Sequence, residues 1–213
     1  MDDYPENTVA AFRAAAPQAD VVECDVQRCR SGELVVFHDE TLDRATDGNG
    51  RVDETDWSQL QELRVHGSDE RIPLLEEVLA AVPADTTVTV ELKAEGIADD
   101  VVDAIERVDN DVIVSSFYWD ELRAARDAGA STLAVLCHED PEGALALAAE
   151  LDCEYVHPPK ELCLDTDFVR RAHDRGVKVN VWTAETPEDV DELRAAGVDG
   201  VSTNRIDIVK RVP

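Results

Sequence analysis

Short β-branched runs alternate with helical segments along most of the chain. From residue 87 onward, these runs lie at 87–93, 112–117, 132–137, 154–159, 177–183 and 200–204. The segments between them repeat apolar residues at helical spacing. Several begin with Asp, Pro or Glu and end with Gly, which are helix start and stop signals. Strands and helices that alternate about every 20–25 residues predict a parallel sheet with helical crossovers.

The N-terminal third of the chain follows the same pattern with one interruption. A helix is predicted over 6–17, with Asn7 or Thr8 as its cap, and a strand over 21–27. The turn Ser-Gly-Glu then leads into a second strand, "ELVVFHD", which we expect to pair antiparallel with the first. A polar loop at 39–56 and a helix over 74–82 follow.

Seven of these strands are expected to be parallel, whereas an eight-stranded TIM barrel needs one more. Because the chain opens directly on a helix, we expect the missing strand before Met1. The predicted fold is therefore an α/β barrel of the TIM type, a single domain over 1–213, without its first strand and with a hairpin inserted after strand 21–27. An open doubly wound sheet is the alternative, weakened because no Gly-rich phosphate loop follows any strand.

The charge of the chain narrows its partners. Asp and Glu total 48 against 20 Lys and Arg, which gives a formal net charge of −28. Such a surface repels nucleic acid and anionic lipid, so we expect neither as a partner. The acids are spread along the whole chain and Lys is scarce, which favours a halophilic protein whose self-repulsion is screened by salt.

The five cysteines include no Cys-x-x-Cys motif, which is typical of reduced thiols in an intracellular protein. Cys24, Cys137 and Cys153 lie in or beside apolar runs and are expected in the core. No apolar segment approaches the length of a membrane span, and the N-terminus does not resemble a signal peptide. We therefore expect a cytoplasmic protein.

Three acids interrupt apolar strands. In "VVECDV", Glu23 and Asp25 point to the same face of one strand, and Glu91 ends another. Two carboxylates about 4 Å apart repel by roughly 4 kcal/mol at an effective dielectric of 20. Three of them together either raise their pKa values or hold a cation. An all-oxygen ligand set suits Ca²⁺ or Mg²⁺ better than zinc.

Other polar groups gather at the same strand ends, where TIM barrels carry their active sites. His38, followed by Asp39, ends the hairpin strand and is the candidate catalytic residue. Lys93 suits an anionic substrate. Phe117 and Trp182 fit either packing at the rim or contact with the substrate. The remaining histidines belong to no recognisable constellation and are interpreted as structural or exposed: His66, His138, His157 and His173.

Taken together, these motifs resemble those of the glycerophosphodiester phosphodiesterase family. The matching segments, in the family's order, are "PENTVAAF", "VVECDVQ", "SGELVVFHDETLDRATDGNG", "IPLLEEVL", "VTVELK", "VSSF", "VNVWT" and "AGVDGVSTN". The resemblance implies hydrolysis of glycerophosphodiesters, which are small molecules, to glycerol 3-phosphate and an alcohol. It also implies a divalent metal on Glu23, Asp25 and Glu91, a catalytic role for His38, and a phosphate-side cation at Lys93.

The sequence departs from the family at its start. Members carry a His-Arg-Gly motif at the end of a first strand, whereas only Met-Asp-Asp-Tyr precedes Pro5 here. A start assigned too late, a truncation and a loss of chemistry each account for this. We favour the first because the other site residues are in place.

Two other functions stand beside hydrolysis of glycerophosphodiesters. A related phosphodiesterase of the same superfamily could act on phosphoinositides or lysophospholipids, although the charge of −28 favours water-soluble head-group diesters. A non-catalytic barrel could instead bind a phosphorylated metabolite or a partner protein. Turnover of soluble diesters separates the first function from both.

Salt dependence tests the halophilic interpretation. We expect the melting temperature to be higher in molar salt than in low salt, because screening removes repulsion among the surface acids. Thermal unfolding at both salt concentrations measures this. Indifference to salt would count against the interpretation.

The missing strand leads to a second prediction. Because the partner of His38 is absent from residues 1–213, we expect this chain to be slow or inactive. We expect a chain extended upstream by about ten residues containing His-Arg-Gly to be more soluble and more active, because it covers a strand edge and adds a second histidine. Solubility and diester turnover of the two proteins test this. Equal activity of both proteins would refute the late-start explanation.

Overall fold

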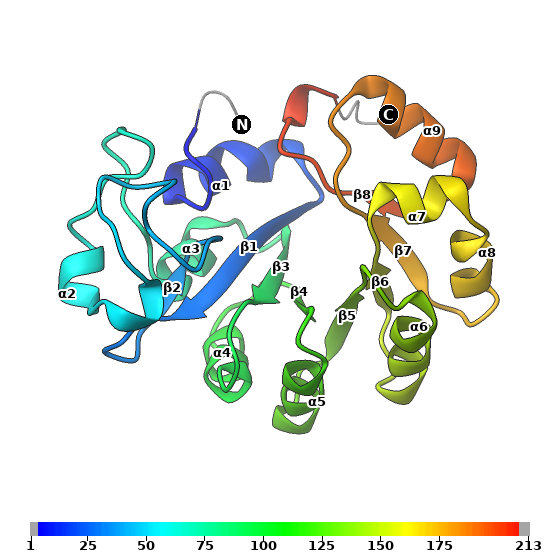
Figure 1. Ribbon diagram of the computed structural model, residues 1–213, viewed down its shortest axis with the longest axis horizontal. Coiled ribbons are helices and arrows are strands. Elements are labelled where there is room, and N and C mark those ends of the chain that lie inside the picture. Colours follow the sequence, from blue (N-terminus) through cyan, green and yellow to red (C-terminus); the bar gives the residue numbers. More distant parts are fainter. Residues whose placement is uncertain (1–3, 209–213) are drawn as a thin grey trace.

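The computed structural model describes residues 4–208 and contains one curved eight-stranded sheet (Figure 1). The strands follow the order β2-β1-β3-β4-β5-β6-β7-β8 across the sheet. Their bounds are β1 Val21–Arg28, β2 Leu34–Val36, β3 Thr87–Leu92, β4 Val112–Ser116, β5 Thr132–Leu136, β6 Tyr155–His157, β7 Lys178–Val181 and β8 Gly200–Val201.

Helices alternate with strands along most of the described chain. They are α1 Val9–Ala15, α2 Trp57–Leu60, α3 Leu75–Ala81, α4 Ala98–Ile105, α5 Trp119–Ala128, α6 Pro141–Glu150, α7 Lys160–Asp165, α8 Phe168–His173 and α9 Pro187–Ala196, with 3₁₀ turns at Ala16–Gln18, Val52–Glu54 and Ile206–Ile208. Figure 1 shows α4, α5 and α6 on the outer side of the curved sheet. This one-sided cover belongs to a barrel and not to a doubly wound sheet.

The pairing of the strands confirms the predicted topology. Strand β1 pairs parallel with β3, and the parallel series continues to β8, so seven parallel strands stand in the described residues. Strand β2 pairs antiparallel with β1, as predicted for the hairpin. Strands β1 and β8 do not pair with each other within residues 4–208, so the sheet is a half-barrel that stays open between them.

Alternation along the strands separates a core face from an inner face. On β1, Val22, Cys24 and Val26 are at most 5% exposed and belong to the main core between the sheet and its helices. Glu23 and Asp25 point the other way, toward the space enclosed by the sheet. The apolar face therefore fixes which side chains line this space, called the lumen below.

Helix ends follow the signals read from the sequence. Thr8 is the cap of α1 and accepts a hydrogen bond from the Ala11 amide at 3.3 Å. Helix α9 begins with a capping box between Thr186 and Asp189. It ends at Gly197, whose φ of 85° is left-handed. These local signals place the helices that return the chain to the next strand.

The segment between β2 and α3 has a small core of its own. The sequence predicts a polar loop over much of it, but apolar side chains from the segment and from the hairpin pack together: Cys29, Val35, Phe37, Leu42, Ala45, Val52, Leu60, Val65 and Ile72. Backbone bridges such as Thr46 with Val65 tie it further. It is thus an ordered subdomain, called the insertion below, that begins at His38.

Two further expectations concern the cysteines and the membrane. All five cysteines are free and buried, which confirms the core positions of Cys24, Cys137 and Cys153. No helix in the described part of the chain combines the length and apolar character that crossing a membrane requires.

Candidate active site

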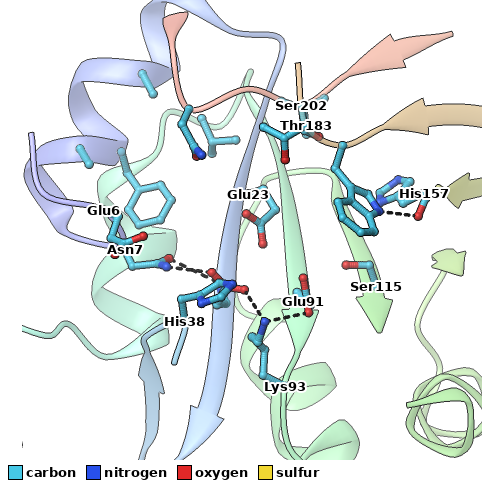
Figure 2. A pocket seen from close by; sticks show the side chains of 18 of the residues that line it. Glu6, Asn7, Glu23, His38, Glu91, Lys93, Ser115, His157, Thr183 and Ser202 are labelled. Atoms are coloured by element: carbon cyan, nitrogen blue, oxygen red, sulfur yellow. Dashed lines mark hydrogen bonds and ion pairs between the residues drawn. The ribbon is translucent and has the colours of Figure 1, made fainter. Parts of the chain in front are cut away.

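The three strand acids meet at one point of the lumen. Asp25 on β1 and Glu91 on β3 are direct neighbours in the parallel register, and Glu23 lies two residues before Asp25. Each of the three carboxylates offers an oxygen, and these oxygens all lie within 4.8 Å of one another. The structure therefore brings together Glu23, Asp25 and Glu91, called the acid trio below. Figure 2 shows Glu23 and Glu91 facing the same space.

Burial and the neighbouring charges raise the pKa of two members of the trio, Glu23 and Glu91. Burial raises the pKa of Glu23 well above its ordinary value, and the charges of Asp25 and Glu91 raise it further. The Glu23 side chain is exposed to solvent in the open lumen, although protein atoms lie on most sides of it. Burial likewise raises the pKa of Glu91, with Lys93 opposing and Asp25 adding to the shift. A nearby positive charge would therefore stabilise the ionised forms of the three carboxylates.

Lys93 offsets part of this charge, and Asn7 hydrogen-bonds to one of the carboxylates. The Lys93 ammonium lies 3.4 Å from Asp25 Oδ1 and 3.3 Å from Glu91 Oε1. Burial lowers the pKa of Lys93, but the two carboxylates outweigh burial and the net shift is upward. Asn7 Nδ2 donates to Asp25 Oδ2 at 2.8 Å. One cation against three acids leaves the cluster short of positive charge.

The insertion supplies an imidazole to the same cleft. His38 is half-exposed, and its Nδ1 lies 2.6 Å from Asp39 Oδ1. Arg44 holds Asp39 through Nε and Nη2, and its Nη1 reaches Glu6 Oε1 at 2.6 Å. Hydrogen bonding to Arg44 lowers the pKa of Asp39 to about 2 against a smaller opposing effect of burial. This anion fixes Nδ1 of His38, and Nε2 forms no hydrogen bond or ion pair within residues 4–208.

Aromatic side chains also line the cleft. The rings of Phe117 and Trp182 meet edge to face, with centroids 5.9 Å apart, and both line the cleft. His138 stacks on Trp182 at 6.1 Å. Trp182 Nε1 donates to the backbone carbonyl of His157 at 2.8 Å, which fixes the indole. Phe117 remains 43% exposed, so its ring is available to a ligand.

The cleft that holds these groups has a volume of about 620 Å³. A second hollow of about 740 Å³ is lined by residues of β1, β8 and strands between them. The two hollows share five lining residues: Ala19, Val21, Glu23, His157 and Ser202. Because the two hollows share lining residues, they adjoin each other inside the sheet. The interior of a closed TIM barrel is instead filled by packed side chains.

Sequence reasoning missed several residues of this cleft. Asn7 was a candidate helix cap, but Thr8 takes that role, and Asn7, with φ of 54°, turns to Asp25. Arg44 follows His38-Asp39 in the same motif, which was an available signal. The sequence indicates a structural or exposed role for His157; the residue is buried, and it also lines the cleft. Its place at the carboxyl end of a strand was the signal.

The geometry of the trio fits a hard divalent cation. Calcium–oxygen bonds of 2.3–2.6 Å allow ligand oxygens on opposite sides of the ion to lie about 4.6–5.2 Å apart. The observed limit of 4.8 Å agrees with this, and the donors are all oxygen. The residues therefore suit a hard divalent cation such as Ca²⁺ or Mg²⁺.

Charge repulsion in the trio gives a stability prediction. A carboxyl whose folded pKa is raised stabilises the fold at low pH, and this contribution is lost as pH rises above about 4.5. In chelator at pH 7, we expect Glu23→Gln to stabilise the protein by about 1 kcal/mol, after allowing for solvent screening, or roughly 2–4 °C in Tm. The gain should shrink at pH 5. Thermal unfolding at both pH values measures it.

Glu192→Gln is the matched control for this experiment. Glu192 is exposed on α9, so its substitution removes one charge from the surface and is expected to shift stability by less than about 0.5 kcal/mol. A Glu23→Gln protein that melts at or below the wild-type temperature at pH 7 would contradict the repulsion.

Comparison with known proteins now identifies the family. The sequence model described as "Glycerophosphoryl diester phosphodiesterase family" matches residues 1–208. A protein of Caldanaerobacter subterraneus subsp. tengcongensis named glycerophosphodiester phosphodiesterase is 32% identical, with 95% of this chain and 89% of the relative covered.

Solved structures of phosphodiesterases have a similar fold. The crystal structure of a glycerophosphodiester phosphodiesterase from Thermotoga maritima matches with a TM-score of 0.84 at 27% identity, covering 97% of this chain and 92% of that one. An Oleispira antarctica phosphodiesterase, solved in complex with the product sn-glycerol-3-phosphate, matches with a TM-score of 0.85 at 26% identity, covering 95% and 89%. The chain belongs to the glycerophosphoryl diester phosphodiesterase family.

Proposed function

We propose that this protein hydrolyses glycerophosphodiesters to glycerol 3-phosphate and an alcohol, with Ca²⁺ or Mg²⁺ held by Glu23, Asp25 and Glu91. The observation that carries the proposal is the meeting of three carboxylate oxygens within 4.8 Å in a cleft that His38 also lines. The family match and the Oleispira antarctica relative with glycerol 3-phosphate support the reaction and its product.

The residues around the trio divide the work of phosphodiester cleavage. A divalent cation, when bound, supplies Lewis-acid charge to the phosphate. Lys93, whose raised pKa keeps it protonated, attracts the phosphodiester anion and offsets charge that builds up on its oxygens. Asn7 holds Asp25 by a hydrogen bond to Oδ2, which fixes the orientation of that carboxylate.

His38 is placed to transfer a proton. With Nδ1 held by Asp39, Nε2 can give a proton to the departing alkoxide. Arg44 keeps Asp39 ionised and in position, so the imidazole keeps one orientation. The family resemblance implies a second histidine from His-Arg-Gly as the partner base. That motif does not occur in residues 1–213, and we assign no residue of this chain to the base.

Soluble head-group diesters are the proposed substrates. The surface charge of −28 disfavours approach to an anionic lipid layer. Phe117 and Trp182 line the cleft beside His157, which lies across Glu91 from His38 (Figure 2), and we propose that they contact the substrate there. Glycerophosphocholine, glycerophosphoethanolamine and glycerophosphoinositol should therefore be turned over faster than lysophospholipids.

Release of glycerol 3-phosphate from glycerophosphocholine tests the proposal. We expect activity with Ca²⁺ or Mg²⁺ and none with chelator. His38→Gln should lower kcat by about 10²–10⁴-fold because it removes the proton donor. Glu91→Gln should lower activity and raise the metal concentration needed for half-maximal rate.

His173→Gln is the control for His38. His173 is a half-exposed histidine paired with Asp199 and does not line the cleft of the trio, so its variant should keep wild-type activity. Full activity in chelator, or an unchanged kcat for His38→Gln, would refute the assignment of these roles.

A further inference from the structure

Two buried polar side chains in the cleft have no hydrogen-bond partner. Ser115 is 1% exposed and His157 is 6% exposed, and both line the cleft that holds the acid trio. Within residues 4–208, neither the Ser115 hydroxyl nor a ring nitrogen of His157 forms a hydrogen bond or ion pair. Neither residue is among those with a fully buried, unpaired side-chain atom, so their polar atoms open onto the cleft and are available to a ligand.

The strands aim both side chains into the lumen. Ser115 on β4 is the register neighbour of Glu91, so the backbones of these two residues lie about one strand spacing, roughly 4.8 Å, apart. On β6, Val156 is fully buried in the main core, so His157 and Tyr155 point to the opposite face. Figure 2 shows Ser115 and His157 on the other side of Glu91 from His38.

This side of the cleft differs in charge from the trio. Burial lowers the pKa of His157 to about 4, so its imidazole is neutral near pH 7. The residues beside His157 on this side are uncharged: Phe117, Leu136 and Trp182 are apolar or aromatic, and Thr183 and Ser202 are polar. The phosphate is attracted to Lys93 and the metal, and the opposite wall offers only uncharged groups.

The available atoms select the chemistry of the ligand. A serine hydroxyl offers one donor and two acceptor positions, and a neutral imidazole offers one donor and one acceptor. Alcohol hydroxyls, which both donate and accept, complement both groups. A trimethylammonium group would leave both unpaired, and an anion would find no cation there.

We propose that Ser115 and His157 form a subsite for the uncharged vicinal hydroxyls of a polyol in the substrate. The inference rests on the proposed function, because it assigns part of the same cleft. The hydroxyls can belong to the glycerol half of the diester or to a polyol leaving group such as inositol. Ser115 reads the hydroxyl nearer the phosphate, and His157 reads one farther along.

Calorimetric titration in the presence of Ca²⁺ tests the subsite. Dissociation constants for glycerol 3-phosphate and for ethyl phosphate, which lacks the hydroxyls, are compared in wild type and Ser115→Ala. Those for glycerophosphoinositol and glycerophosphocholine are compared with and without Ser115→Ala in a His38→Gln background, which keeps the diesters intact. His157→Phe repeats the series, His157→Gln restores a polar group, and Ser131→Ala, at an exposed serine outside both hollows, is the control.

The pattern of losses identifies the source of the hydroxyls. If the glycerol half is bound, Ser115→Ala weakens glycerol 3-phosphate about ten-fold and ethyl phosphate less than about two-fold. If a polyol leaving group is bound, glycerophosphoinositol weakens about ten-fold while glycerophosphocholine and both phosphates do not. Either result, with the same pattern for His157→Phe and partial recovery in His157→Gln, supports the subsite.

Equal losses for all four ligands, or no loss for any of them in a variant with wild-type circular dichroism, overturn the subsite. The proposed function fails separately. A protein that shows the expected selective losses but releases no glycerol 3-phosphate from any diester keeps the subsite and loses the enzymatic assignment. Binding and turnover are measured independently, so the two failures are distinguishable.

Discussion

Repulsion among three carboxylates held in one small space is the constraint on which the rest of the site depends. Glu23, Asp25 and Glu91 cannot move apart, because β1 and β3 are locked in register by the apolar core on their other face. Lys93 relieves only part of the charge, and Asn7 hydrogen-bonds to one of the carboxylates. The fold thus uses core packing to maintain a cluster of negative charge that a divalent cation would neutralise.

The insertion between β2 and α3 positions the imidazole of His38 beside the acid trio. An imidazole on a loose loop would be poorly placed beside the trio, whereas here a small apolar core orders the segment that begins at His38. Asp39 and Arg44 extend this order to the ring itself, and Arg44 also reaches Glu6 just before α1. The site is therefore built from three separate parts of the chain, each fixed by its own packing.

Most of the fold and the centre of the site could be predicted from local patterns. Alternating residues on β1 revealed both its core face and the pair Glu23 and Asp25, and the positions of the parallel strands followed from their β-branched runs. Asn7 and Asp25 are 18 residues apart, and their contact depends on how α1 packs. The order of the insertion likewise depends on apolar residues scattered over 29–72. His157 carries no local signal beyond its strand end, since its lack of a partner appears only in the folded chain.

Anomalous diffraction from crystals grown with Mn²⁺ in place of Ca²⁺ or Mg²⁺ tests the central claim most directly. The account predicts one strong peak in the lumen, about 2.0–2.6 Å from an oxygen of each of Glu23, Asp25 and Glu91. Peaks confined to the acidic outer surface, with none at the trio, would contradict it. Lys93 would then be the cation that compensates the charge of the three carboxylates within residues 4–208, without a metal ion.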